Sequence, residues 1–393
     1  MPDTHFDVIL VGGGVMGCAI ATYLLRANNH LKIALVEMDP TYTRASTPLS
    51  DGNTRVQFNI KENIQMSQYA LTVLATFAEE MAVNGEKPDI AFRQQGNLFL
   101  IDSASQEETL EGLARQQSLG CQVEWLTPDD IQQQYPFLHV PEYVGATLGR
   151  QDGTMSPLAV LLAYKNKAIA LGAQFIQAEV AELLYEKQQI TGVRLVNGEQ
   201  LLGPAVVNTA GAWGTKLAQT AGILLPMQPI KRQVTVVETS VRRDGILPCL
   251  FFPSGLYCIH EGAGLFMVGK SFPDDPVTLD DFGWERGRFE ELLWPELVEY
   301  MPAFDRLKIK QGWAGLYEVN TLDGNAILGE WPEMGGFYLA NGFSGHGFQQ
   351  CHAVGRYLSE LILGQTPTLD LSIFSPRRIL ENQPVFESRR KII

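Results

Sequence analysis

Cysteine and histidine are both scarce in this chain, and neither is grouped. The 393 residues include five cysteines, an odd number, with no C-x-x-C pair among them. This usage favours free thiols in a reducing compartment over a disulfide framework or a zinc site. The six histidines are scattered without metal-ligand spacing, so we expect no metal site.

Positive charge and long apolar runs are also lacking. Thirty basic residues against 44 acidic ones give a formal net charge of −14. Such an acidic chain is poorly matched to nucleic acid or to an anionic membrane surface. No stretch approaches the roughly 18 apolar residues of a membrane span. Because the first motif begins about six residues from Met1, we expect no signal peptide and predict a cytoplasmic location.

The strongest positive signal lies near the start of the chain. An apolar run from Phe6 to Val11 leads into Gly12, Gly14 and Gly17, and a helical pattern follows over 15–26. This strand–glycine–helix order is the setting in which G-x-G-x-x-G spacing binds a dinucleotide. The first glycine permits a tight turn, the second admits the pyrophosphate, and the third lets the helix pack on the strand. Free N–H groups at the helix start would hold the phosphates.

An acidic residue ends the next predicted strand. A second apolar run over 32–36 ends in Glu37, twenty residues after Gly17. A carboxylate at this position accepts hydrogen bonds from the adenosine ribose and disfavours a 2′-phosphate, so NADP is not expected. The first forty residues therefore predict a dinucleotide site that includes Val15 and Met16 at the start of the helix.

The remaining patterns predict an α/β fold (α+β overall) in two parts. A Rossmann-type nucleotide-binding domain is expected over residues 1–88, 145–225 and 322–393, and a β-rich substrate domain, inserted discontinuously, over 89–144 and 226–321. Asn197-Gly198 predicts a hairpin turn, and Ser156 followed by Pro157 predicts a helix start. Apolar spacing also predicts helices over 61–82, 106–117, 284–300 and 348–363, a strand pair over 90–101 and a strand over 308–314.

Several motifs are recognisable as a set. They are GGGVMG, SDGNTR, DGTMSP, NTAGAWG, GLYEVNTLDGNAILG and NGFSGHGFQQ, in that order. In these motifs the chain resembles the FAD-dependent D-amino-acid-oxidase superfamily, in the branch of sarcosine oxidase, dimethylglycine dehydrogenase and glycine oxidase. Its TRVQFNIKENIQMS and NGFSGHGFQQ segments look closest to the mitochondrial FAD-dependent oxidoreductase linked to respiratory complex I assembly and to its bacterial relatives.

The resemblance implies FAD as the cofactor. It places Val180 at the adenine and the loop over 342–348 against the flavin. Glycines on both sides of His346 would let the backbone approach a planar ring, where N–H groups stabilise negative charge. The other residues that it places at the cofactor are Thr54, Arg55, Ala210, Gly211, Trp213, Gly342, Phe343, Ser344, Gly345, Gly347, Phe348 and Gln349.

The resemblance also implies that FAD is bound non-covalently. Relatives that tether the flavin use a cysteine just before the tyrosine that matches Tyr317, or a histidine in the loop before Arg55. Residues 313–316 contain no cysteine and residues 48–53 contain no histidine.

Three residues are expected at the substrate by the same resemblance. Arg55 matches an arginine that sits near the flavin, and Tyr317 matches a tyrosine that lines the substrate cavity. Tyr257 is a weaker candidate. The alternatives are a surface salt bridge for Arg55 and ordinary core packing for the two tyrosines.

The departures from the resemblance concern the substrate carboxylate. Sarcosine oxidase holds it with an arginine and a lysine, at positions where this chain has Phe58 and Gln349. The clamp is therefore absent or is supplied from elsewhere, with Arg93, Arg232 and Lys270 as candidates.

A cation that activates oxygen in sarcosine oxidase aligns with Met267 here, with Lys270 one turn of register away. A cation beside the flavin stabilises the superoxide-like charge that develops when an oxidase reacts with oxygen. Because this cation is lost, we favour a dehydrogenase with another electron acceptor over an oxidase.

The predicted reaction is oxidation of a secondary or N-methyl amine, an amino-acid derivative, by hydride transfer to flavin N5. Arg55 and the 342–348 loop, with His346 and Gln349, would stabilise the reduced flavin, while Tyr257 and Tyr317 orient the substrate. A 2-hydroxy acid is a variant within the same class. The alternative function is a flavoprotein assembly or interaction factor with little turnover, whose partner is another protein.

Overall fold

The first strand–helix–strand unit forms the centre of a six-stranded sheet in this computed structural model, which describes residues 4–139, 142–240 and 245–387. The strand order is β18-β19-β12-β1-β2-β8, and all neighbours are parallel except β18 and β19. The strands are β1 (Val8–Val11), β2 (Ile33–Glu37), β8 (Gln174–Gln177), β12 (Ala205–Asn208), β18 (Ile327–Glu330) and β19 (Phe337–Asn341).

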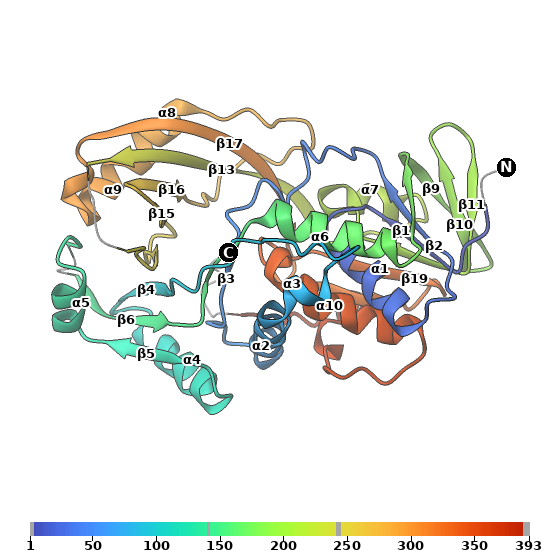
Figure 1. Ribbon diagram of the computed structural model, residues 1–393, viewed down its shortest axis with the longest axis horizontal. Coiled ribbons are helices and arrows are strands. Elements are labelled where there is room, and N and C mark those ends of the chain that lie inside the picture. The colour runs from blue at the N-terminus through green and yellow to red at the C-terminus, as the bar shows by residue number, and fades with distance from the viewer. Residues whose placement is uncertain (1–3, 140–141, 241–244, 388–393) are drawn as a thin grey trace.

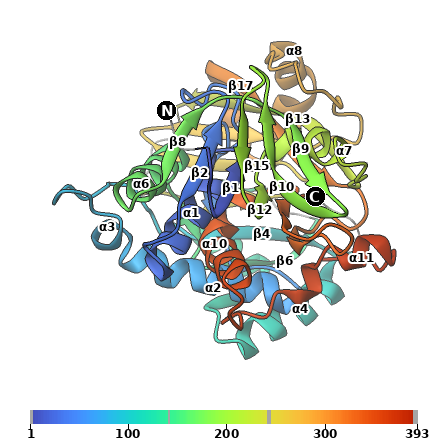
Figure 2. The same cartoon turned by 90° about the vertical axis from the view of Figure 1, so that its right-hand side faces the viewer.

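Each face of this sheet has a different cover (Figure 2). Val8 and Leu10 point into a core shared with helices, whereas Ile9 and Val11 point into a core shared with a three-stranded antiparallel sheet. Burial on both faces explains why the parallel strands are continuous apolar runs in the sequence. The helices are α1 (Val15–Ala27), α2 (Lys61–Ala75), α3 (Phe77–Glu80), α6 (Pro157–Ala170) and α10 (Gly347–Ile362), and the small sheet comprises β9 (Val180–Glu186), β10 (Gln189–Leu195) and β11 (Gln200–Leu202), with α7 (Gly214–Gln219) beside it.

A second, eight-stranded sheet occupies the left half of Figure 1, in the order β17-β13-β16-β15-β14-β4-β6-β5. Its longest strands, β13 and β17, pair from Met227 opposite Asn320 to Thr239 opposite Leu307. The strands are β4 (Asn97–Asp102), β5 (Val123–Leu126), β6 (Tyr143–Gly149), β13 (Met227–Thr239), β14 (Cys249–Phe251), β15 (Tyr257–Gly262), β16 (Leu265–Gly269) and β17 (Leu307–Asn320).

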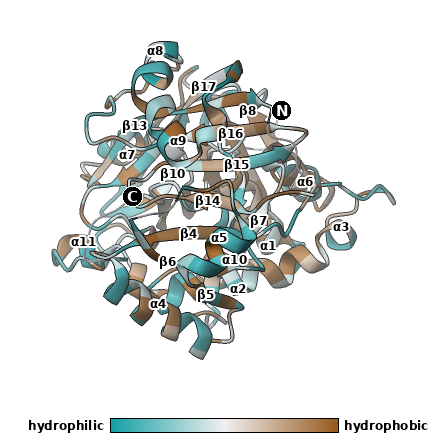
Figure 3. Cartoon of the chain, turned by 90° about the vertical axis from the view of Figure 1, so that its left-hand side faces the viewer, coloured by the Kyte–Doolittle hydropathy of each residue, from teal (hydrophilic) through white to brown (hydrophobic). Residues whose placement is uncertain are grey.

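One face of the eight-stranded sheet is buried under short helices. Leu98, Leu148 and Val268 share a core with Leu297 of α9. Figure 3 shows apolar strands such as β4 behind a hydrophilic α5. The helices of this part are α4 (Gln106–Ser118), α5 (Pro128–Gln134), α8 (Arg286–Arg288) and α9 (Trp294–Tyr300). The other face turns towards the six-stranded sheet, and the two-stranded sheet of β3 (Asn53–Thr54) and β7 (Gly153–Thr154) lies between them.

The α/β class and most local predictions are confirmed. Ser156 caps α6 through a hydrogen bond from the Ala159 N–H, and Gly198 turns the β10–β11 hairpin with a φ of +90°. All five cysteines are buried free thiols. Over the described ranges, no cluster of three or more His, Cys, Asp or Glu side chains could hold a metal. No helix in the same ranges is long and apolar enough to cross a membrane.

Four local predictions need correction. The strand pair over 90–101 is one strand, β4, because Gly96 turns the chain with a φ of +84°. The helix over 61–82 stops at Ala75, and α3 follows after Thr76. The helix over 284–300 contains a π-helical turn, Phe289–Leu293, just before Pro295, whose missing N–H breaks the α-helical bonding pattern.

The fourth correction concerns β17, which is fourteen residues long and extends well beyond the predicted 308–314. Two glycines and several polar residues interrupt its apolar alternation, so the sequence alone marks only part of it. The division into two domains stays a prediction. By sheet membership, its boundary at residue 145 falls inside β6, which pairs with β4 and β5 in the eight-stranded sheet.

A buried ion pair anchors the C-terminal segment. Arg378, in α11 (Arg377–Leu380), donates to both oxygens of Asp323 at 2.8 and 3.2 Å, and to the carbonyl of Phe374. Removing the guanidinium would leave the buried Asp323 carboxylate without its counter-charge. We therefore expect Arg378→Met to lower the free energy of unfolding by about 3–5 kcal/mol.

The neighbouring arginine is the matched control for this denaturation measurement. Arg377 is largely exposed and lies 3.8 Å from Glu381. Arg377→Met should change stability by no more than about 0.5 kcal/mol. Equal losses for the two variants would contradict the assignment of Arg378 as the anchor.

Candidate functional site

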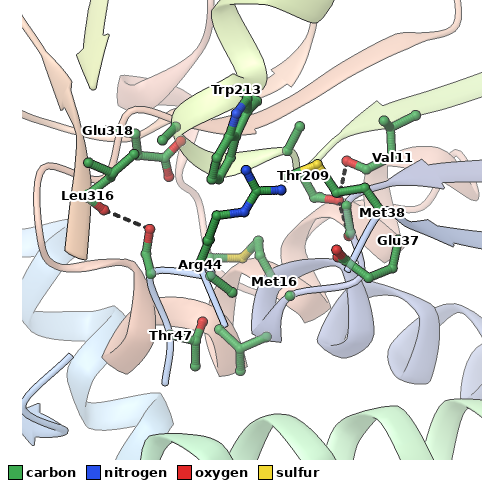
Figure 4. A pocket seen from close by; sticks show the side chains of 18 of the residues that line it. Val11, Met16, Glu37, Met38, Arg44, Thr47, Thr209, Trp213, Leu316 and Glu318 are labelled. Carbon is green, nitrogen blue, oxygen red and sulfur yellow. Dashed lines mark hydrogen bonds between the residues drawn. The ribbon is translucent and has the colours of Figure 1, made fainter. Parts of the chain in front are cut away.

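A cavity of about 350 Å³ lies at the carboxyl ends of β1, β2 and β12, where α/β sheets bind ligands. It runs from Glu37 at one end to Glu318 at the other (Figure 4), and Tyr317, the residue before Glu318, also lines it. Its walls include the following predicted cofactor residues: Gly12, Gly14, Val15, Met16, Glu37, Val180, Ala210, Gly211, Trp213, Phe343, Gly345, Gly347 and Phe348. Their individual roles remain predictions.

The glycines of the G-x-G-x-x-G fingerprint, Gly12, Gly14 and Gly17, divide into two kinds. A side chain at Gly12, whose φ is +108°, would collide with the carbonyl of Thr209, and one at Gly17 would collide with the carbonyl of Gly12. These two glycines are required by the fold. A Cβ at Gly14 would meet no protein atom within 4 Å, although Gly14 lines the cavity. The space beside Gly14 is therefore a cradle that fits a pyrophosphate against the start of α1.

Glu37 shapes the turn that it borders. Its Oε2 accepts a hydrogen bond from the Gly13 N–H at 2.8 Å, and its Oε1 accepts one from the Asp39 N–H at 2.8 Å. Burial raises the pKa of Glu37, against these backbone hydrogen bonds. Each carboxylate oxygen keeps a second lone pair, which leaves acceptors for the ribose hydroxyls that the sequence predicts.

Two cations in the middle of the cavity were missed by the sequence analysis. Arg44 lies with its guanidinium carbon 5.8 Å from the centre of the Trp213 ring, and Lys216 of α7 lines the same wall. Figure 4 shows Arg44 between the Glu37 and Glu318 ends. Two cations between an adenosine end and a ring end suit a diphosphate. The only signal for Arg44 in the sequence is that it is a basic residue in the polar loop after β2.

The glycine loop packs directly on Tyr317 at the far end. A Cβ on Gly345 would overlap the Tyr317 ring, so only glycine allows this approach. Gly347 and Phe348 line the cavity at the start of α10, where the first N–H groups of a helix have no partner in the helix. The positive end of α10 therefore faces the cavity and favours negative charge there.

Arg55 is brought together with two residues predicted at the flavin, His346 and Gln349, and with Phe58. Its Nη2 lies 3.0 Å from His346 Nε2, and its backbone N–H donates to Gln349 Oε1 at 2.7 Å. Its guanidinium carbon lies 4.6 Å from the centre of the Phe58 ring. Burial and the Arg55 charge lower the pKa of His346 to about 3, so the imidazole is neutral and can accept from Arg55. The structure gives Arg55 an interior cluster in place of the alternative surface salt bridge.

Two further candidates, Tyr257 and Met267, lie on the face of the eight-stranded sheet that turns away from the short helices. On β15 and β16, Tyr257 stands opposite Gly269, and Met267 stands opposite Ile259. Both lie on the side opposite to Val268, which is buried among the helices. A Cβ on Gly269 would overlap the Tyr257 ring, so this tyrosine lies flat across β16.

Arg232 joins this face from β13. Its guanidinium carbon lies 5.6 Å from the centre of the Tyr317 ring. It donates to Asp275, which also accepts from Arg288, so two cations share one carboxylate. The Nε of Arg232 is buried and has no hydrogen-bond partner within the described part of the chain.

Two other cationic candidates are engaged elsewhere, which corrects the prediction for Lys270. Lys270 follows Val268 on the helix side of β16, and its Nζ donates to Glu296 of α9 at 2.6 Å. A two-residue alternation therefore directs it away from the cavity face. Arg93 donates to Glu261 at 2.7 Å.

The predicted cofactor residues Thr54, Arg55, Gly342, Ser344, His346 and Gln349 do not line this cavity themselves. Ser344 accepts a hydrogen bond from the Asn320 N–H at 3.0 Å.

The open space beside Gly14 generates a prediction. Because a Cβ there meets no protein atom, Gly14→Ala should fold with unchanged stability but obstruct the pyrophosphate. We expect FAD affinity to fall at least about tenfold, which corresponds to 1.4 kcal/mol of lost binding. Titration of the apoprotein with FAD, followed by flavin fluorescence, measures it.

The contrasting variant is Gly17→Ala, whose methyl group collides with the Gly12 carbonyl. It should lose stability before any cofactor is added. Normal FAD binding by Gly14→Ala would rule out the cradle.

The comparisons with known proteins agree with this geometry. The sequence profile of the DAO family, described as "FAD dependent oxidoreductase", matches residues 7–361. The chain is 35% identical to "FAD-dependent oxidoreductase domain-containing protein 1" of Xenopus laevis, over 98% of this chain and 85% of that protein. It is 31% identical to "Monomeric sarcosine oxidase" of Bacillus sp. (strain B-0618), over 96% and 97% of the two chains.

A solved structure shows the same architecture over nearly the whole length. The crystal structure of L-proline dehydrogenase from P. horikoshii superposes with a TM-score of 0.86 at 26% identity, covering 98% of this chain and 100% of that one. Taken with the fingerprint and the cavity, these matches mean that the chain belongs to the DAO family of FAD-dependent oxidoreductases, with FAD as its cofactor.

Proposed function

We propose that this protein oxidises a secondary or N-methyl amino acid with FAD bound along the cavity. The adenosine would lie at Glu37, the diphosphate beside Gly14 and Arg44, and the ring at the end formed by Tyr317 and Phe343. Bound FAD supplies a hydride acceptor at N5, and the oxidised product is an imine that water hydrolyses. The residues of the chain bind and orient the substrate and stabilise charge.

The observation that carries the proposal is the surplus positive charge of Arg232 beside Tyr317. Arg232 shares one carboxylate, Asp275, with Arg288 of α8, so these three side chains together carry one net positive charge. The buried, unpartnered Nε of Arg232 offers a donor for a further anion. A substrate carboxylate supplies both the charge and the acceptor, as an amino acid requires.

Tyr257 and Tyr317 provide neutral donors on the same face. Burial raises the pKa of Tyr317 to about 12 and also raises that of Tyr257, so both keep their O–H protons at neutral pH. The charge of Asp51 contributes to raising the pKa of both tyrosines. Such an acid can receive a proton from a substrate ammonium, which must be neutral before its carbon gives up a hydride.

Arg55 would stabilise the negative charge that arrives with the electrons. Because His346 is held neutral, it accepts from Arg55 without cancelling the Arg55 charge. Met267 offers no cation on the sheet face where the resemblance expects one for oxygen activation. We therefore favour an electron acceptor other than oxygen.

The second candidate function is a flavoprotein with little turnover that acts by binding another protein. One observation favours it. Phe58 and Gln349, which replace the carboxylate clamp of sarcosine oxidase, are both committed to holding Arg55, through its guanidinium and its backbone N–H. A site that has exchanged its substrate charges for internal contacts is consistent with a reduced catalytic role.

Anaerobic bleaching of the flavin absorbance separates the two candidates. The holoprotein is mixed with N-methyl, secondary and primary amino acids and 2-hydroxy acids, with dithionite as the control for reducibility. Rapid bleaching by one class supports the enzyme and names its substrate. Admission of air then distinguishes an oxidase from a dehydrogenase. Bleaching by dithionite alone would favour the protein-binding function.

The role of Arg232 predicts a selective kinetic defect. Arg232→Gln should raise the KM for the amino acid about 10- to 100-fold, since a hydrogen bond to a charged group contributes about 1.5–3 kcal/mol. The corresponding amine without a carboxylate should be affected far less. Lys270→Gln is the control, because Lys270 lies on the helix side of β16 and donates to Glu296. Equal KM changes with both substrates would exclude Arg232 as the carboxylate ligand.

A further inference from the structure

Glu318 is an acid at the ring end of the cavity to which no role has yet been given. It belongs to β17, opposite Pro229 of β13, and directly follows Tyr317. Its carboxylate borders the cavity close to Leu316 (Figure 4). The opposite end of the cavity is fixed by Glu37, so a dinucleotide that extends from there brings its ring towards Glu318.

The carboxylate is attached to the glycine loop by hydrogen bonds. It accepts from the backbone N–H groups of Gly342 and Phe343, and Asn341 Nδ2 lies 3.4 Å from Oε2. The Glu318 carbonyl accepts from the Ser344 N–H at 3.1 Å. These contacts hold the acid in one place against the loop that approaches the ring.

The surroundings favour the neutral acid. Burial raises the pKa of Glu318 to about 7, although the hydrogen bonds from Gly342, Asn341 and Phe343 oppose the shift. No described lysine or arginine forms an ion pair with it. Near neutral pH, both charge states are therefore populated before any charge is added nearby.

An unsatisfied acceptor beside Glu318 also favours the neutral form of this acid. Asn341 is fully buried, and its Oδ1 has no donor among the described residues. A carboxylate offers only acceptors, whereas a neutral carboxyl group also carries an O–H donor. Protonation of Glu318 would give this part of the site a donor that it otherwise lacks.

Other charged groups at the ring end are Arg55, Arg232 and Asp51, whose charges act on the neighbouring Tyr317. Arg44, Lys216, Glu37, Asp39 and Glu179 line the cavity together with Glu318, with Arg44 between the Glu37 and Glu318 ends (Figure 4). On β13, Lys231 stands opposite Leu316, and its charge is taken up by Asp281 and Glu285. None of them is among the causes of the Glu318 shift, which are burial and three hydrogen bonds.

We infer that Glu318 takes up one proton from solvent when the bound FAD receives two electrons. A negative ring beside a buried carboxylate would place two like charges close together, which favours protonation of the acid. The electron pair and one proton go to the ring. A second proton forms an O–H bond on Glu318, and the acid is neither oxidised nor reduced. The inference rests on bound FAD and not on the proposed amine substrate.

The dependence of the flavin midpoint potential on pH counts these protons. Each proton taken up with two electrons changes the potential by about 30 mV per pH unit. Above about pH 7, the midpoint potential of the wild-type holoprotein should change by about 60 mV per pH unit. That of Glu318→Gln should change by about 30 mV per pH unit. Below about pH 7, where Glu318 is already neutral, the two lines should run parallel. Dye-equilibrated reductive titration measures the potential without substrate.

The matched control is Glu387→Gln. Glu387 also has a pKa raised to about 7 by burial and also holds two backbone N–H groups, those of Asn59 and Ile60, each at 2.8 Å. It does not line the cavity, so this variant should keep the wild-type slope. A wild-type slope in Glu318→Gln, or a one-proton slope in the wild type above pH 7, would overturn the inference.

A second measurement covers the case in which Glu318→Gln does not fold. The infrared difference spectrum of the wild type, recorded on photochemical reduction above pH 7, should gain the C=O band of a protonated carboxyl group that shifts in D₂O. The absence of that band would overturn the inference. Failure of every amine to bleach the flavin would leave both measurements intact, so the two proposals fail separately.

Discussion

The whole structure depends on how closely two backbone segments approach each other at the end of β1. Gly12 and Gly17 have no room for a side chain, because the carbonyls of Thr209 and Gly12 occupy that space. The Thr209 hydroxyl fastens the contact by donating to the carbonyls of Val11 and Gly12 at 3.0 and 2.8 Å. This crossing sets β12 beside β1 and points α1 at the cavity. The cofactor site is therefore built from contacts that the fold itself needs.

The second fixed point lies where the two large sheets meet. The far end of β17 reaches the glycine loop, and hydrogen bonds run in both directions between Ser344 and residues 318 and 320. Gly345 packs against the ring of Tyr317. Because the loop also starts α10, the substrate side of the site moves with the cofactor side. Preorganisation of this kind keeps the two reacting partners in a fixed relation.

The sequence specified the parts of the site whose residues are constrained by the backbone. The fingerprint glycines and Glu37 have a fixed spacing, so they could be placed without a structure. Arg44 could not, because a flexible cation in a polar loop satisfies no pattern. Lys270 was misplaced for a different reason. In a strand, a shift of one residue moves a side chain to the opposite face, and β16 is too short for its apolar pattern to fix the register. The length of β17 was hidden by its glycines, which the fold uses for close packing.

The distribution of charge gives the site its chemical character. At the ring end, Arg232 is only half neutralised, Arg55 touches a neutral histidine, and the start of α10 presents free N–H groups. The acids nearby, Asp51 and Glu318, are both shifted by burial towards their neutral forms. Positive charge thus remains available while negative charge is suppressed. Such a site favours a process that brings in an anionic carboxylate and then adds electrons, and it stabilises both additions with groups that are already in place.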